Sequence, residues 1–280
     1  MSSDRSQVFG PGAAPPGVQV KDVMRDDFGF EVPIESVPIP SRGVVYPDSS
    51  PLHNQETIDI RAMTAREEDI LTSRALIKKG TVISHLLQSC IVDKRVNVNE
   101  MLTGDRNSVM VALRITGYGS DYNVEAECPA CSNKSKQTFN LSELQVKPLE
   151  IDPSSQGENS FEFRLPVTKK TVRFKFLTGL DEEEILQIQE RKKKTGAIAD
   201  SLVTTRLQYA VISVEGKTDK ALISNFIRNM PARDSLALRT YIDKHEPGID
   251  MKVFMECPSC SESSEIRMPM GAGFFWPGAE

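Results

Sequence analysis

The chain has 280 residues, of which 39% are hydrophobic and 26% charged, and its formal net charge is −5. No apolar run approaches the ~18 residues that span a bilayer, and the acidic balance argues against a protein whose main ligand is a nucleic-acid backbone. Because the N-terminus has no apolar signal segment, we expect the cysteines to lie in a reducing compartment. The composition predicts a soluble protein with protein partners and no membrane span.

Residues 1–38 are predicted to form a flexible N-terminal arm. They are rich in Pro, Gly, Ser and Asp and hold too little apolar surface to offset the entropy of ordering. Within the arm, Phe28 and Phe30 begin an alternation that continues through Val32 and Ile34. This pattern is compatible with a strand added to a neighbour's sheet edge, which makes Phe28 and Phe30 candidate partner contacts. A disordered linker is the simpler alternative.

Residues 39–150 are expected to form a first module of strands, helices and a hairpin. Alternation from Ile58 to Ala62 predicts a strand, and Thr64 with Glu67 is the capping-box signature of a helix start. Cys90 lies on an apolar helix face and is predicted to be a buried core residue. Helices are expected over about 65–79, 81–92 and 104–116.

A strand-like run then leads into Cys128-Pro129-Ala130-Cys131, and a second run leads into Cys257-Pro258-Ser259-Cys260 at an offset of 129. Alternating residues over 161–165 and 172–176 predict another hairpin, and Glu182-Glu183-Glu184 echoes the acidic helix start at Glu67 with an offset of 115. The offset rises from 115 at Glu67 to 129 at the cysteine pairs, so the second half must contain an insertion between these points. We place this insertion around 213–220. The sequence predicts an α+β fold of two tandem pseudo-repeated modules, 39–150 and 155–270, packed as one pseudo-twofold unit.

The two Cys-Pro-X-Cys pairs supply four thiolates, the number that a closed tetrahedral zinc site takes. The pairs are too far apart in the chain for one zinc ribbon, but a pseudo-twofold arrangement would bring both pairs to one metal. Two metal-free knuckles and a redox dithiol are the alternatives that remain. The predicted ligands are Cys128, Cys131, Cys257 and Cys260.

The C-terminal segment 271–280 holds the only Trp of the chain beside two Phe residues. Phe274, Phe275 and Trp276 are candidate partner contacts, because aromatic anchors are enriched at interface hot spots. The alternative is that this tail folds back and closes the protein's own core.

The sequence contains no Gly-rich phosphate loop, His-Glu-X-X-His or Gly-X-Ser-X-Gly motif, and its acidic clusters fall at helix starts, where they stabilise exposed N–H groups. We therefore expect no enzymatic activity. A zinc-ribbon protein that binds nucleic acid is the alternative function, but the one dense basic run, 191–194, ends a predicted helix and has no interleaved aromatic residues.

Several separated motifs resemble, in order, the T-even-type phage baseplate hub and hub-assembly family: Ile39–Gly43, Met63–Ser73, Gly104–Asn107, Ile115–Gly119 and Cys128–Cys131, with Phe274–Trp276 near the end. The resemblance covers about 39–276. It implies a structural or assembly role at the hub of a contractile tail, with other tail or baseplate proteins as partners and a possible oligomer. It also implies a location in the infected bacterial cytoplasm during assembly, or in the virion baseplate.

Overall fold

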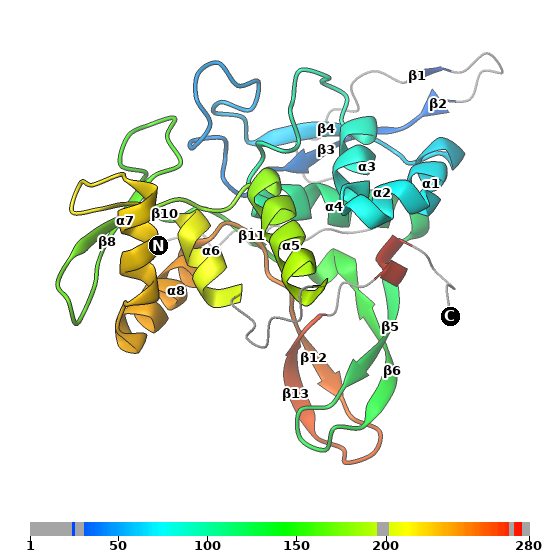
Figure 1. Cartoon of the computed structure of the whole chain (residues 1–280). Helices are drawn as coiled ribbons and strands as arrows, with labels where there is room; N and C mark the ends of the chain where they lie inside the picture. The colour runs from blue at the N-terminus through cyan, green and yellow to red at the C-terminus, as the bar shows by residue number, and fades with distance from the viewer. Residues whose placement is uncertain (1–23, 26–30, 195–201, 269–271, 276–280) are drawn as a thin grey trace, which may run out of the picture.

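The computed structural model of the chain describes residues 24–25, 31–194, 202–268 and 272–275. This part contains eight α-helices and several small antiparallel sheets, which confirms an α+β fold (Figure 1). Among the helices of these ranges, none combines the length and the apolar composition that a membrane span needs.

The N-terminal part begins with short strands and continues into helices and a long hairpin. Its elements are β1 (Met24–Arg25), β2 (Glu31–Val32), β3 (Ile34–Pro38), β4 (Thr57–Arg61), α1 (Ala65–Thr72), α2 (Arg74–Lys79), α3 (Val82–Cys90), α4 (Thr103–Tyr118), β5 (Asp121–Glu127), β6 (Lys134–Asn140), a 3-10 turn (Leu141–Glu143) and β7 (Val146–Lys147). β3 pairs with β4, so a strand of the first sheet lies inside the segment 1–38 that the sequence predicted as an arm.

The helix predicted over about 65–79 is two helices, because the chain breaks at Ser73. This residue has an extended ψ of 103°, and its N–H closes the first helix on the Ile70 carbonyl. Thr72 before it turns its hydroxyl back onto the carbonyls of Glu68 and Asp69, a contact that bends helices. The helices expected over about 81–92 and 104–116 are confirmed as α3 and α4.

The C-terminal part runs from a hairpin through helices to a second hairpin. Its elements are β8 (Phe161–Arg164), β9 (Thr171–Phe174), α5 (Gly179–Lys194), α6 (Leu202–Ala210), β10 (Val211–Val214), α7 (Lys220–Arg228), α8 (Ala232–His245), β11 (Gly248–Ile249), β12 (Lys252–Glu256), β13 (Ser263–Arg267) and a 3-10 turn (Ala272–Phe275). β8, β9 and β10 form a three-stranded sheet, which confirms the hairpin expected over 161–176.

The two parts are joined tightly along the middle of the molecule. β7 pairs with β11, and the Thr103 N–H donates to the Leu177 carbonyl at 2.9 Å. Arg106 of α4 lies against the first residue of α5, Gly179, and donates to the Ser84 hydroxyl of α3 at 2.8 Å. Buried residues from both parts form one apolar cluster that runs from Val37 to Phe275.

Two buried carboxylates tie helix starts to neighbouring strands. Glu67, in the first turn of α1, is fully buried and accepts from Arg61 at 2.6 Å, from Ser89 at 2.6 Å and from the Thr64 N–H at 2.9 Å. In α4, Asp105 is also fully buried and accepts from the Ser41 N–H at 2.9 Å and from the hydroxyls of Ser41 and Tyr46. These carboxylates therefore fix the loops on either side of β4.

Replacing Gly179 by Ala should destabilise the chain by about 3 kcal/mol, because the new Cβ would lie 1.4 Å from Nη1 of the buried Arg106. Chemical denaturation of both proteins measures the difference in the free energy of unfolding. Gly216→Ala is the control: its φ of +75° strains an alanine, but no atom lies within 4 Å, so the cost should stay near ~1 kcal/mol. Equal losses in the two variants would contradict the close contact at Gly179.

Glu67→Gln should cost about 3 to 5 kcal/mol at pH 7, because it leaves the Arg61 guanidinium without its anion. Burial would raise the pKa of Glu67, but hydrogen bonds from Arg61, Ser89 and Thr64 outweigh burial and hold the pKa well below its usual range. The stabilisation is therefore present above the unfolded pKa of 4.5 and is lost as the pH falls below it. Denaturation curves between pH 7 and acid should converge for the two proteins; a gap independent of pH would contradict this.

Candidate metal centre

Each Cys-Pro-X-Cys pair forms the turn of a β-hairpin. In the first turn, the Cys128 N–H donates to the Asn133 carbonyl at 2.9 Å and the Ser132 N–H donates to the Cys128 carbonyl at 2.8 Å. In the second turn, the Cys257 N–H donates to the Glu262 carbonyl at 3.0 Å and the Ser261 N–H donates to the Cys257 carbonyl at 2.8 Å. Ser132 and Ser261 both have a φ of +57°, a conformation that glycine adopts more easily. The two turns have the same geometry, and the hairpins predicted from the sequence are confirmed.

The two turns meet, although they lie in opposite halves of the chain. The Sγ atoms of all four cysteines lie within 4.8 Å of one another. Cys128 and Cys260 are 3.8 Å apart, and Cys131 and Cys257 are 3.6 Å apart, so each close pair joins one hairpin to the other. The structure thus brings together the four residues that the sequence selected as ligands.

These distances fit a closed metal site. Four sulfurs at about 2.3 Å from a central Zn²⁺ would lie about 3.8 Å from one another at the corners of a tetrahedron. All four cysteines are free thiols, and none of the sulfur separations is that of a disulfide. The donor set, four thiol groups without a carboxylate or imidazole, is that of structural zinc sites.

Backbone N–H groups in the turns point at the sulfurs. Hydrogen bonds from the N–H groups of Cys260 and Ser259 lower the pKa of Cys257 to about 7. For Cys131, the N–H of Asn133 lowers the pKa, but the neighbouring thiols raise it more, to about 12. The turns thus supply N–H donors that stabilise thiolates, the form in which cysteine binds metals.

The strands behind the cysteines place their apolar side chains on one, buried face of each hairpin. Alternate residues of β5 and β12 are buried, including Tyr122, Ala126 and Met255, and the last buried position of each series is a cysteine, Cys128 or Cys257. Cys131 and Cys260 lie on the exposed side of the cluster. Figure 1 shows the β5–β6 and β12–β13 hairpins side by side, projecting from the helical body.

The predicted aromatic contacts lie elsewhere. Phe274 and Phe275 are 2% and 4% exposed, and the Phe274 ring meets the Tyr122 ring edge-to-face at 5.3 Å. This arrangement corresponds to the alternative in which the tail closes the protein's own core, so a partner could reach these rings only if they left it. Phe28, Phe30 and Trp276 lie outside the described residues. Cys90 is fully buried, as predicted.

One surface residue was missed by the sequence reasoning. Phe254 of β12 is 73% exposed, although its neighbours Val253 and Met255 are also apolar. The strand pattern could have identified it, because successive side chains of a strand point to opposite faces. If Cys257 faces inward, Met255 and Val253 also face inward, and Phe254 lies on the outer face.

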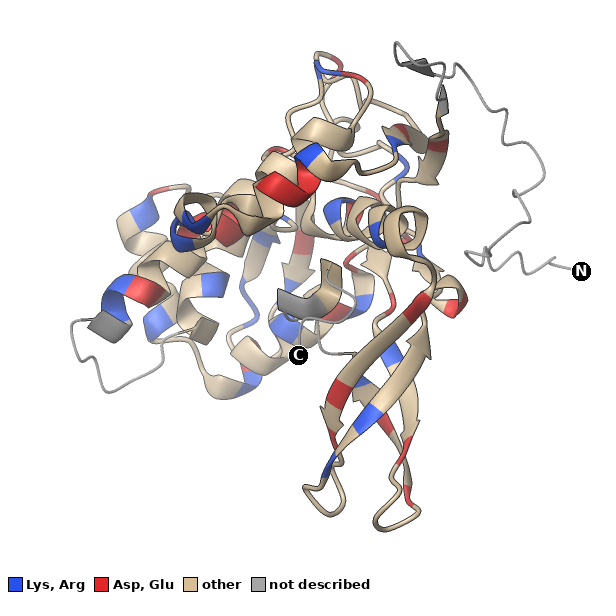
Figure 2. Cartoon of the chain, turned by 90° about the vertical axis from the view of Figure 1, so that its right-hand side faces the viewer, with Lys and Arg blue, Asp and Glu red and all other residues tan. Residues whose placement is uncertain are grey.

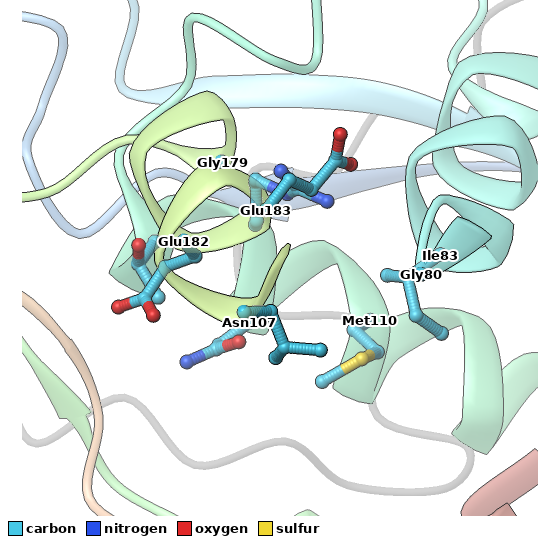
Figure 3. A pocket seen from close by; sticks show the side chains of 10 residues that line it. Gly80, Ile83, Asn107, Met110, Gly179, Glu182 and Glu183 are labelled. Atoms are coloured by element: carbon cyan, nitrogen blue, oxygen red, sulfur yellow. The ribbon is translucent and has the colours of Figure 1, made fainter. Parts of the chain in front are cut away.

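A hollow of about 220 Å³ lies between α3, α4 and α5, away from the cysteines (Figure 3). Ile83, Met110 and Leu186 supply apolar wall, and Arg106 and Glu183 supply charge. Arg106 donates to the Ser84 hydroxyl, which in turn donates to Glu183, so the Ser84 hydroxyl bridges the two charged groups. We assign no ligand to this hollow.

A family model described as T4 bacteriophage base plate protein matches residues 47–276, which is most of the chain. No curated protein and no solved structure matches significantly. The match includes both cysteine pairs and ends at Trp276, and it agrees with the resemblance carried by the sequence motifs. The chain therefore belongs to the T4 bacteriophage base plate protein family.

Proposed function

We propose that the chain is a structural or assembly protein of the hub of the phage baseplate, which acts by contacting other tail or baseplate proteins and catalyses no reaction. The observation that carries this proposal is the four-cysteine cluster, which joins two hairpins into one projection, within a chain of the base plate family. A projection of this kind suits a scaffold that must present a fixed surface. Assembly would take place in the cytoplasm of the infected bacterium.

Cys128, Cys131, Cys257 and Cys260 would hold one structural Zn²⁺. The metal would supply a crosslink between the two hairpins and no reaction chemistry. Among the alternatives, a redox dithiol needs only two sulfurs and gives no reason for four to converge. Two metal-free knuckles likewise give no reason for four sulfurs from separate turns to converge, whereas a tetrahedral metal requires that arrangement.

The proposal includes the tandem repeat, 39–150 and 155–270, flanked by the arm 1–38 and the tail 271–280. Matching contacts support it. In the first half, Arg61 pairs with Glu67, which accepts from the N–H and hydroxyl of Thr64; in the second half, Lys175 pairs with Asp181, which accepts from the N–H and hydroxyl of Thr178. The offset at the helix start is thus 114 and not the 115 that we inferred from the acidic run.

The remaining offsets support two insertions. Ile91, directly after α3, bridges to Ile60, and Val211, directly after α6, pairs with Phe174 in the same way. The offset from Ile91 to Val211 is 120, which is larger than the offset at the helix start. From Asp105 to Asp234 the offset is 129, and both carboxylates accept from N–H groups of the preceding hairpin turn. In the proposed repeat, the extra residues would therefore lie between α5 and α6 and again between β10 and α8, where α7 lies, rather than at one loop around 213–220.

Purified protein should contain one zinc ion per chain, measured by elemental analysis. Cys131→Ser and Cys260→Ser should each lose it, because a closed site needs all four thiolates and these two cysteines are exposed enough to be replaced without a core cavity. Cys90→Ala, a cysteine remote from the cluster, should keep its zinc. Two zinc ions per chain, or zinc retained in either serine variant, would contradict a shared site.

A phage whose only copy of this gene encodes Cys131→Ser should produce few complete tails, because the two hairpins would no longer be fixed to each other. Electron microscopy of lysates counts baseplates and tails directly. The Glu143→Ala variant, at an exposed site in the turn after β6, should assemble normally. Normal tail yield from a zinc-free variant would contradict the proposed link between the cluster and assembly.

A further inference from the structure

The two projecting hairpins differ on their outer faces. Every outward side chain of β5–β6 is polar: Asp121, Asn123, Glu125, Glu127, Lys134, Lys136, Thr138 and Asn140. The outer face of β12–β13 consists of Lys252, Phe254, Glu256, Ser263, Glu265 and Arg267. Phe254, at 73% exposure, is the most exposed large hydrophobic residue in the described part of the chain.

Phe254 stands at the centre of this outer face. It lies directly opposite Glu265 on β13, with the pair Lys252 and Arg267 on one side and the pair Glu256 and Ser263 on the other. Lys252 and Glu265 form an ion pair at 3.3 Å. An aromatic ring surrounded by polar side chains is the arrangement of an interface anchor with its rim.

The charges on this face are separated along the strands. The end near the body carries Lys252 and Arg267, both basic, whereas the end near the cysteines carries Glu256. On β5–β6, Glu125 lies across from Lys136 and Glu127 across from Lys134, so the charges near the cysteines balance, and the end near the body carries Asp121 and no basic residue. Figure 2 shows these charged strands on the projection.

We propose that the outer face of β12–β13 binds the same face of a second copy of this chain, about a two-fold axis through Phe254. In that arrangement the two Phe254 rings stack, and the basic end of each copy lies over the acidic end of the other. Lys252 and Glu256 are four residues apart, about 13 Å along a strand, so both ends meet their opposites at once. The inference goes beyond the baseplate role and does not depend on it.

A second copy fits this face better than an unrelated partner because the face is complementary to itself. Lys252 and Arg267 lie at one end of the face and Glu256 at the other, and the single apolar residue, Phe254, lies between the two ends beside Glu265. A two-fold contact requires that each patch match its own rotated copy. With six residues per side, the contact is smaller than the ~800 Å² per partner of stable complexes, so we expect a weak and reversible dimer.

Sedimentation velocity of the full-length protein over about 5 to 500 µM should show a monomer that converts to dimer in the upper part of this range. Phe254→Ser should weaken association by about tenfold or more, because each dimer loses both central rings. Glu125→Ser, at the equivalent position of the other hairpin, is the matched control and should leave association unchanged. Circular dichroism verifies that each variant is folded.

A charge exchange tests the orientation. Lys252→Glu with Arg267→Glu makes both ends of the face acidic, and Glu256→Lys makes both ends basic, so neither variant should dimerise alone. An equimolar mixture of the two should dimerise, because every acidic end then meets a basic one. The proposal is overturned if the native chain stays monomeric, if Phe254→Ser dimerises as well as the native chain, or if the mixture does not associate.

Discussion

The structure depends on one constraint: four cysteine sulfurs from two turns in opposite halves of the chain must reach the same point. The loop between the two cysteine pairs contains almost the whole second half of the chain, so bringing its ends together costs conformational entropy that the contacts must offset. A metal bound at this place would offset that cost, because the site forms only in the folded chain and its binding free energy adds to the free energy of folding. The strands behind the cysteines then fix which side chains face inward and which, like Phe254, face solvent.

In the body of the molecule, polar contacts at helix starts hold the strands and turns in place. Glu67 and Asp181 anchor the first helix of each half to the strand before it, and Asp105 and Asp234 hold the preceding turns. Buried carboxylates of this kind are costly when unpaired, so each is surrounded by donors. The joint between the halves, where Arg106 covers Gly179, leaves no room for a side chain, which explains a glycine at the first position of α5.

Local patterns predicted local structure well. The capping box at Thr64, the Cys-Pro-X-Cys turns and the buried Cys90 all follow from short-range chemistry and are present. The burial of Phe274 depends on the Tyr122 ring in the other half of the chain, so it was not visible in a window of sequence. The break at Ser73 is local, but a threonine hydroxyl that bonds back to its own helix also occurs in unbroken helices, so Thr72 did not predict the break. Several carboxylates stand at the start of α5, and only the hydrogen bonds distinguish Asp181 from Glu182 as the capping residue.

X-ray absorption at the zinc edge of the purified chain tests the central claim most directly, since it reports the atoms around the metal and their distances. A shared site predicts a single shell of four sulfurs at about 2.3 Å. A protein without zinc, or a shell in which oxygen or nitrogen replaces two of the sulfurs, would contradict the claim that both hairpins hold the same ion.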